Sequence, residues 1–200
     1  MDDVVDIQAQ ELLEALRKGA LVALGRAISH VESGGDVALA LLDLIHAESG
    51  NSARIGVTGP PGTGKSTLVS SLAEAMREQD DDASLAVVAI DPSSPFTGGA
   101  LLGDRFRMHA IADDPKVFIR SMASRGALGG LSEATEAACD VLEAADYTNI
   151  IIETVGVGQS EVDIASACDT TVLVLNPESG DTIQALKAGL MEIADVLVVN

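Results

Sequence analysis

The sequence predicts an α/β fold: a doubly wound, mostly parallel sheet with helices on both faces, preceded by a small helical segment. Two patterns support this fold class. Apolar residues recur at helical steps in the first fifty residues, and from Arg54 onward short β-branched runs alternate with helical stretches. Apolar residues make up 47% of the 200-residue chain, which is enough to bury a core and argues against intrinsic disorder.

Helices fill the N-terminal part of the chain. Gly19 is placed to end the first helix, and the turn at residues 33–36 ends the second and caps a third, from Val37 to about Ala47. The following residues, 48–52, are rich in turn-forming types. We therefore expect a helical N-terminal segment over residues 1–50 and a sheet domain over residues 51–200. The apolar positions of the first two helices are Leu12, Leu13, Leu16, Leu21, Leu24, Ile28 and Val31.

Strands and helices alternate through the sheet domain. The predicted strands are continuous apolar runs, which is typical of strands that connecting helices bury on both faces. A mostly parallel sheet is therefore expected. The strands cover residues 55–58, 85–90, 117–119, 149–153, 171–175 and 196–199, and the helices cover residues 65–78, 132–145 and 181–193.

The charge balance is strongly acidic. Lys plus Arg number 12 and Asp plus Glu number 31, a net charge of −19, which repels nucleic acids and anionic membranes. Aromatic residues are only 2%, which argues against binding by stacking on exposed aromatic side chains. Dense carboxylates with only four lysines suit a salt-rich cytosol, where screening removes self-repulsion. A halophilic source is our hypothesis, and an ordinary acidic bacterial protein is the alternative.

The sequence predicts a cytoplasmic location. It contains no run of about 18 apolar residues, and the opening Met1-Asp2-Asp3 has the wrong charge for a signal peptide. The two cysteines, Cys139 and Cys168, lie far apart and form no C-x-x-C pair. We interpret both as buried small side chains in a reducing compartment.

Residues 59–66, GPPGTGKS, match the phosphate-loop pattern G-x-x-x-x-G-K-[ST] between a predicted strand and a predicted helix. Glycines let successive backbone N–H groups turn toward phosphate oxygens, and the helix adds its positive amino end. Lys65 is expected to reach the β- and γ-phosphates, and the Ser66 hydroxyl to coordinate Mg²⁺. The motif predicts a P-loop NTPase. Nucleotide contacts are assigned to Gly59, Pro60, Pro61, Gly62, Thr63, Gly64, Lys65, Ser66 and Thr67.

Acidic residues follow the predicted strands. Asp91 ends the second strand, beside the phosphate loop, and Asp104 lies in a Gly-rich stretch, residues 93–108, that we interpret as a mobile loop ordered by nucleotide. Glu153 follows the next central strand, where an acid holds the metal through water, and the N–H of Gly156 is placed to meet the γ-phosphate. The predicted metal ligands are Ser66, Asp91, Asp104 and Glu153, and the predicted catalytic residues are Lys65, Asp104, Glu153 and Gly156.

The rate of hydrolysis also has a predicted determinant. Val157 directly follows Gly156, where small regulatory GTPases often place a water-orienting glutamine, and Gln159 is out of register. We therefore expect slow intrinsic hydrolysis that a partner protein accelerates. Arginines could stabilise transition-state charge, or could simply pair with surface carboxylates. The candidates are Arg105, Arg107, Arg120 and Arg125.

Several segments together resemble one family, the MeaB/ArgK-type GTPases. These are G-protein chaperones of cobalamin-dependent methylmalonyl-CoA mutase and include the methylmalonic aciduria type A proteins. The segments are GVTGPPGTGKST (56–67), AIDPSSPFTGGALLGDRFRM (89–108), VFIRSMASRGALGGLS (117–132), IIETVGVGQSEVDIA (151–165) and NPESGDTIQALKAG (176–189). The opening at 15–33 also looks like the family's N-terminal region, so the resemblance covers essentially the whole chain. Older names call similar proteins LAO/AO transport system ATPases, but nothing in the sequence shows a site for a guanidino substrate.

The resemblance implies GTP as substrate and Mg²⁺ as its cofactor, with Asp91, Asp104 and Glu153 as acidic residues of switch loops. It also implies a partner, methylmalonyl-CoA mutase or a related acyl-CoA mutase, whose cobalamin loading such proteins gate and whose activity they protect. Residues 176–187 resemble an additional switch segment that communicates with the mutase. Members of the family form homodimers.

One departure from the family concerns guanine. Family members select it with Asn-Lys-x-Asp after the strand at 196–199, and here only the Asn, Asn200, is reached. Asn200 is assigned to the base site by this resemblance. We expect the rest of the motif, the C-terminal part of the family fold and its dimerisation segment to lie outside this chain. The alternatives are a truncated, non-catalytic fragment that binds nucleotide or a partner, and a metal-insertion GTPase of a related branch.

Overall fold

A computed structural model of the chain describes residues 2–46, 50–91, 108–123, 133–154, 160–176 and 189–200. The chain divides into two compact units. One, the helical unit, consists of Met1–Ser52 and Glu133–Thr148, and the other, the sheet unit, consists of Ala53–Ser132 and Asn149–Asn200.

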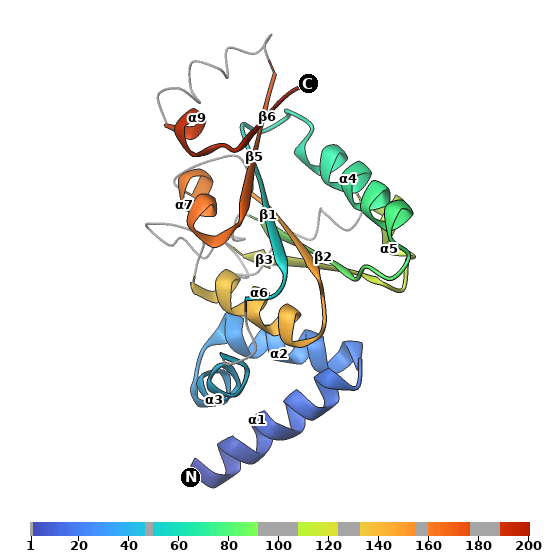
Figure 1. Ribbon diagram of the computed structural model, residues 1–200. Coiled ribbons are helices and arrows are strands. Elements are labelled where there is room, and N and C mark those ends of the chain that lie inside the picture. The colour runs from blue at the N-terminus through green and yellow to red at the C-terminus, as the bar shows by residue number, and fades with distance from the viewer. Residues whose placement is uncertain (1, 47–49, 92–107, 124–132, 155–159, 177–188) are drawn as a thin grey trace. The chain divides into compact units, whose positions relative to one another are not determined.

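The described helices of the helical unit are α1 (Asp2–Arg17), α2 (Leu21–Ser33), α3 (Asp36–Ile45) and α6 (Glu133–Ala144). Helix α1 packs against α3, and α2 packs against α6 (Figure 1). The three predicted N-terminal helices are present, and the first is followed by Gly19 with a φ of 74°, a conformation that glycine adopts without strain. We expected the helix at 132–145, but its grouping with the N-terminal helices was not foreseen.

The sheet unit is built on six parallel strands in the order β3-β2-β4-β1-β5-β6. The strands are β1 (Ala53–Thr58), β2 (Leu85–Asp91), β3 (Val117–Ala123), β4 (Asn149–Glu153), β5 (Thr170–Leu175) and β6 (Val196–Val199). Strand β1 lies between β4 and β5, with Val57 opposite Glu153 on one side and Val172 on the other. The predicted parallel sheet is confirmed, and the carboxyl ends of its central strands meet at one edge.

Helices cover both faces of this sheet. Helices α4 (Lys65–Gln79) and α5 (His109–Ala112) lie on one side, and α7 (Ser160–Ala167) and α9 (Leu190–Ile193) lie on the other (Figure 1). On the first side, Val69 and Ala73 of α4 are fully buried against a cluster that includes Val57 and Ile151. On the other, Ile164 of α7 packs over Gly56. The doubly wound arrangement is confirmed. The helix expected at 181–193 is described only over Leu190–Ile193, and the loop expected at 93–108 lies outside the described residues apart from Met108.

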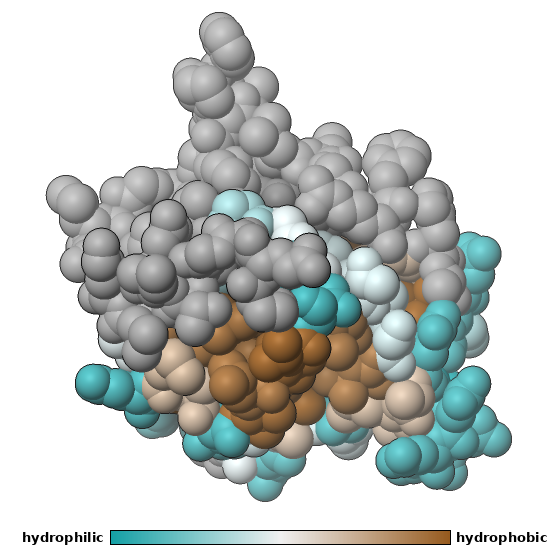
Figure 2. Space-filling view, turned by 90° about the horizontal axis from the view of Figure 1, so that it is seen from above, coloured by the Kyte–Doolittle hydropathy of each residue, from teal (hydrophilic) through white to brown (hydrophobic). Residues whose placement is uncertain are grey.

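Apolar side chains remain exposed at one border of the sheet unit. Strand β6 exposes Val196, Leu197 and Val199, and α9 exposes Met191. Apolar surface is visible on the face shown in Figure 2. Within the described part of the chain, no helix has the length and apolar character needed to cross a membrane.

Candidate functional site

The phosphate loop connects the end of β1 to the start of α4, at the carboxyl edge of the sheet. Gly59, its first residue, has a φ of 136°, and a Cβ there would lie 2.1 Å from the carbonyl oxygen of Val174 on β5. Any side chain would collide with that backbone, so Gly59 lets the chain turn out of the sheet beside β5. Gly64 ends the loop with a φ of 90° in the left-handed region, directly before the helix.

Lys65 is the first residue of α4, and its side chain folds back over the loop. Its Nζ donates hydrogen bonds to the carbonyl oxygens of Gly59, at 2.8 Å, and Pro60, at 2.9 Å. The residue is only 6% exposed. The loop therefore holds a buried ammonium group next to the amino end of a 15-residue helix, which also carries partial positive charge. Both features favour an anion at this place.

Ser66 and Glu153 are brought together across the sheet edge. Ser66 Oγ, in the first turn of α4, donates a 2.6 Å hydrogen bond to Glu153 Oε1 at the end of β4. The carboxylate belongs to a residue that is 6% exposed. A hydroxyl and a carboxylate are hard oxygen donors of the kind that Mg²⁺ prefers, so these two residues fit the predicted metal.

The other predicted site residues are placed as follows. Asp91 ends β2, the strand next to β4, but its side chain is outside the described set. Arg120 lies within β3 and is partly buried, while Thr67 is exposed in the first turn of α4. Outside the described residues lie Asp104, Gly156, Val157, Gln159, Arg105, Arg107 and Arg125.

Asn200 contacts the phosphate loop. Its backbone N–H donates to the carbonyl oxygen of Leu175, and its side-chain Nδ2 donates to the carbonyl oxygen of Thr63, both at 2.9 Å. Thr63 in turn donates its hydroxyl to the carbonyl oxygen of Pro60 at 2.9 Å. The amide assigned to the base site therefore also braces the loop from the β6 side of the sheet.

Sequence reasoning missed a buried pair of hydroxyls beside the loop. Thr154 Oγ1 donates to Thr58 Oγ1 at 3.0 Å, and the Thr154 N–H donates to the Val57 carbonyl at 3.0 Å. Thr58 is fully buried and Thr154 is 1% exposed. Their positions were visible in the sequence, one before Gly59 and one after Glu153. Predicting their contact would have required knowing that β1 pairs with β4, and the spacing of apolar residues along the sequence does not specify which strands pair.

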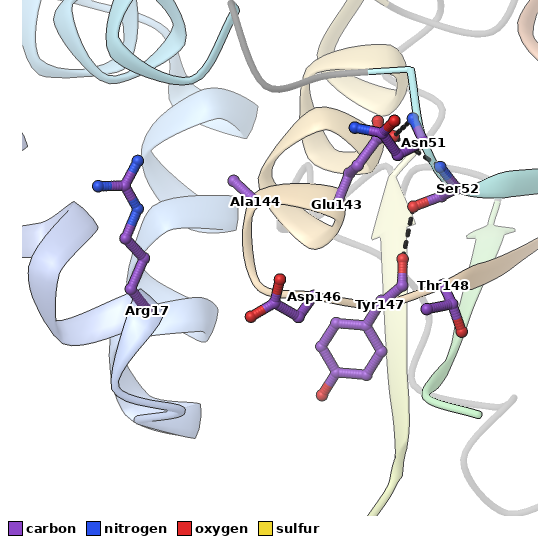
Figure 3. Close-up of a pocket in the computed structure, with 8 residues that line it drawn as sticks. All are labelled: Arg17, Asn51, Ser52, Glu143, Ala144, Asp146, Tyr147 and Thr148. Atoms are coloured by element: carbon purple, nitrogen blue, oxygen red, sulfur yellow. Dashed lines mark hydrogen bonds between the residues drawn. The ribbon is translucent and has the colours of Figure 1, made fainter. Parts of the chain in front are cut away.

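A hollow of about 470 Å³ lies in the helical unit (Figure 3). Its buried carboxylate, Glu143, accepts backbone hydrogen bonds from Gly50, Asn51 and Ser52 through Oε1. Ser52 also donates its hydroxyl to the Tyr147 carbonyl, and burial raises the pKa of the Tyr147 phenol. Because Glu143 is held by the protein's own backbone, we assign it a structural role.

Comparison with known families agrees with the phosphate-loop geometry. The family model described as methylmalonyl-CoA mutase-associated GTPase MeaB matches residues 24–200. The chain belongs to the MeaB family. A protein of Pyrococcus horikoshii whose name describes it as a GTPase is 52% identical over 190 residues, covering 95% of this chain and 59% of its own length. GTPase ArgK of Escherichia coli is 41% identical, covering 95% of this chain and 58% of its own length. The mitochondrial methylmalonic aciduria type A homolog of Caenorhabditis elegans is 38% identical, covering 98% of this chain and 52% of its own length.

Solved structures show the same fold. The crystal structure of an LAO/AO transport system kinase matches with a TM-score of 0.70 and 32% identity, over 96% of this chain and 55% of that one. The hydrogenase maturation factor HypB of Archaeoglobus fulgidus matches with a TM-score of 0.53 and 15% identity, over 97% of this chain and 74% of its own, a likeness of fold alone. The present chain thus spans little more than half the length of the MeaB-family relatives it matches.

Proposed function

We propose that this MeaB-family chain binds GTP with Mg²⁺ at the phosphate loop and hydrolyses it. The observation that carries the proposal is the juxtaposition at the loop: a buried Lys65 ammonium, a helix amino end, and the Ser66 hydroxyl in contact with Glu153. One positive group and two hard oxygen donors at one sheet edge suit a phosphate chain and its metal. The family match supports guanine as the base.

Different residues of the chain would bind the phosphates and the metal. Lys65 exchanges its two carbonyl partners for phosphate oxygens, and the loop N–H groups, oriented by the turn at Gly59, bind the same anion. Ser66 and Glu153 would hold Mg²⁺, with Asp91 and Asp104 as further proposed ligands. When bound, the metal neutralises charge that develops on the phosphates. Gly156 is proposed to bind the γ-phosphate, so that the segment after β4 responds to hydrolysis.

The proposed role of this hydrolysis is to assist a cobalamin-dependent acyl-CoA mutase of the methylmalonyl-CoA mutase type, by gating cofactor loading and protecting the enzyme. The family description and the methylmalonic aciduria type A relative support this partner. The mutase partner is therefore supported by the family relationship alone. Nucleotide binding is supported both by that relationship and by the geometry of the phosphate loop. Co-elution with a methylmalonyl-CoA mutase that depends on a non-hydrolysable GTP analogue is the expected result. Co-elution regardless of nucleotide would favour a non-catalytic scaffold.

Glu153→Gln tests the hydrolytic part of the proposal. The amide keeps the size and one oxygen of the side chain but removes its charge. We expect single-turnover GTP hydrolysis with magnesium to fall about tenfold or more. Glu192→Gln, at an exposed carboxylate on α9, is the matched control and should hydrolyse GTP at the unsubstituted rate. Equal hydrolysis rates in both variants would contradict the proposed role of Glu153 in the site.

A further inference from the structure

We propose that the buried hydroxyl pair of Thr58 and Thr154 is a positioning contact that sets the phosphate loop against the carboxyl end of β4. The proposal rests on the proposed function, because it concerns the same site. It assigns a role to two residues that lie just outside the phosphate-loop motif and just after the predicted metal ligand Glu153.

The pair occupies the point where two chain segments leave the sheet together. Thr58 is the last residue of β1 and precedes Gly59, while Thr154 follows Glu153, the last residue of β4. The Thr154 N–H donates to the Val57 carbonyl, which extends the ladder between the strands by one bond. The hydroxyl bond, at 3.0 Å, then joins the two side chains directly.

Burial makes this bond more than a packing contact. Thr58 is 0% exposed and Thr154 is 1% exposed, so both hydroxyls have lost their water. Two valines would have nearly the same shape without that desolvation. A hydrogen bond, however, has a preferred length and direction that methyl groups lack. We therefore infer that the hydroxyl pair aligns the carboxyl ends of β1 and β4.

This alignment bears directly on the proposed metal ligands. On its β5 side the start of the loop is confined, because a Cβ at Gly59 would lie 2.1 Å from the Val174 carbonyl oxygen. On its β4 side the hydroxyl pair is the adjoining polar contact. Glu153, next to Thr154, accepts a 2.6 Å hydrogen bond from the hydroxyl of Ser66, in the first turn of α4 just after the loop. A small slip of β4 would separate these oxygens, and Mg²⁺ tolerates little departure from its preferred geometry.

The test uses the full chain with valine and serine substitutions. The double variant Thr58→Val/Thr154→Val removes both hydroxyls together, so neither is left buried without its partner. Thr154→Ser keeps the hydroxyl and serves as the conservative variant. Thr171→Val is the matched control. It removes a hydroxyl from a threonine that is 2% exposed and lies at the amino end of β5, away from the phosphate loop.

We expect the double variant to melt within about 3 °C of the unsubstituted chain. Its kcat for GTP should fall about tenfold with KM within about twofold. The magnesium concentration for half-maximal binding of a fluorescent GDP analogue should rise about tenfold, and the amide of residue 154 should exchange about tenfold faster while that of Ile151 is unchanged. Thr154→Ser and Thr171→Val should behave as the unsubstituted chain does.

A double variant with unchanged kcat, magnesium requirement and amide exchange would overturn the proposal and leave the pair as packing. The failure of the proposed function looks different, since the unsubstituted chain would then bind no Mg²⁺–nucleotide. In that event the exchange of the residue 154 amide still decides whether the hydroxyl pair aligns the strands.

Discussion

Backbone atoms hold two of the charged side chains that the structure buries. Lys65 donates to two carbonyl oxygens of the phosphate loop, and Glu143 accepts from three successive N–H groups. The two contacts differ in whether an external anion can bind there. Lys65 sits where an anion can replace its partners, whereas Glu143 itself supplies the anion to the turn at 50–52. The first arrangement suits binding and the second suits stability.

Glu143→Ala is therefore expected to destabilise the chain by about 1–3 kcal/mol, because the backbone N–H groups of Gly50, Asn51 and Ser52 lose the charged acceptor that they share. Glu143→Gln keeps one acceptor oxygen and should cost about half as much. Urea unfolding measures both, with Glu136→Ala, at an exposed carboxylate on the same helix, as the control. If Glu143→Ala and Glu136→Ala unfold at the same urea concentration, the structural role assigned to Glu143 is wrong.

The environment of Cys168 leads to a prediction about thiol reactivity. Burial raises the pKa of its thiol to about 12, and its Sγ would lie only 3.0 Å from a Cβ at Gly56. Cys139 is 0% exposed, as predicted, whereas Cys168 is only partly buried, so the prediction that both cysteines are buried is correct for Cys139 alone. Because the thiolate is the reactive form, both cysteines should react with an aromatic disulfide reagent at pH 8 only after denaturation. A thiol that reacts at the rate of free cysteine in the folded chain would contradict the raised pKa of Cys168 or the burial of Cys139.

At the scale of elements, alternation predicted all six strands, with ends that differ by up to four residues, the largest shift being at β3. Buried parallel strands are continuous apolar runs, so they stand out from their surroundings. The short helices α5 and α7 were not predicted, since segments of four and eight residues carry little periodic signal. The grouping of α6 with α2 was missed for another reason. An apolar helix face shows that a helix is buried, but not against which partner.

The phosphate loop was predictable as a site because one contiguous motif carries it. The contacts that complete it come from β4 and from Asn200, far away in the sequence. Glu153 was found through its place after a strand, but its bond to Ser66 and the Thr58–Thr154 pair depend on strand order. Strand order is a property of the whole sheet and leaves no local pattern in the sequence.

The turn between α4 and β2 gives a prediction for pH dependence. The Arg77 Nε donates to Asp114 Oδ2 at 2.8 Å, and its Nη1 donates to the carbonyls of Asp80, Asp81 and Ala83. This guanidinium, with the Lys116 N–H, holds the pKa of Asp114 below its usual value. A carboxyl with a lowered folded pKa stabilises the fold above its unfolded pKa and loses that contribution as the pH falls through the folded pKa.

Asp114→Asn should therefore lower the free energy of unfolding by about 1–2 kcal/mol at pH 7. The difference from the unsubstituted chain should shrink as the pH is lowered below about 4. Urea unfolding at pH 7 and in the acid range checks this, with Asp113→Asn, at the exposed neighbour, as the control. A difference that does not change with pH would show that the charge of Asp114 is irrelevant.

At the scale of the whole molecule, the net charge of −19 is the dominant long-range feature. Self-repulsion of this size opposes folding in dilute buffer and is screened by salt. We predict that the midpoint of thermal unfolding rises steadily between about 0.1 M and molar KCl. A midpoint that does not rise with KCl would remove the halophilic hypothesis.

An acidic molecule that binds a polyanion needs local positive potential. Here that potential comes from a lysine, a helix end and backbone N–H groups, all acting at contact distance, while the net charge acts through screened solvent. The proposed hydrolysis and its proposed effect on a mutase both depend on nucleotide occupying that one loop.

The most direct measurement is a calorimetric titration of the full chain with Mg²⁺–GTP, repeated with Lys65→Ala and with Lys116→Ala, at an exposed lysine at the amino edge of the sheet. We predict one binding site in the unsubstituted chain, the same affinity in Lys116→Ala, and a loss of about 100-fold or more, on the order of 2.7 kcal/mol, in Lys65→Ala. Retained affinity in Lys65→Ala would contradict nucleotide binding at the phosphate loop.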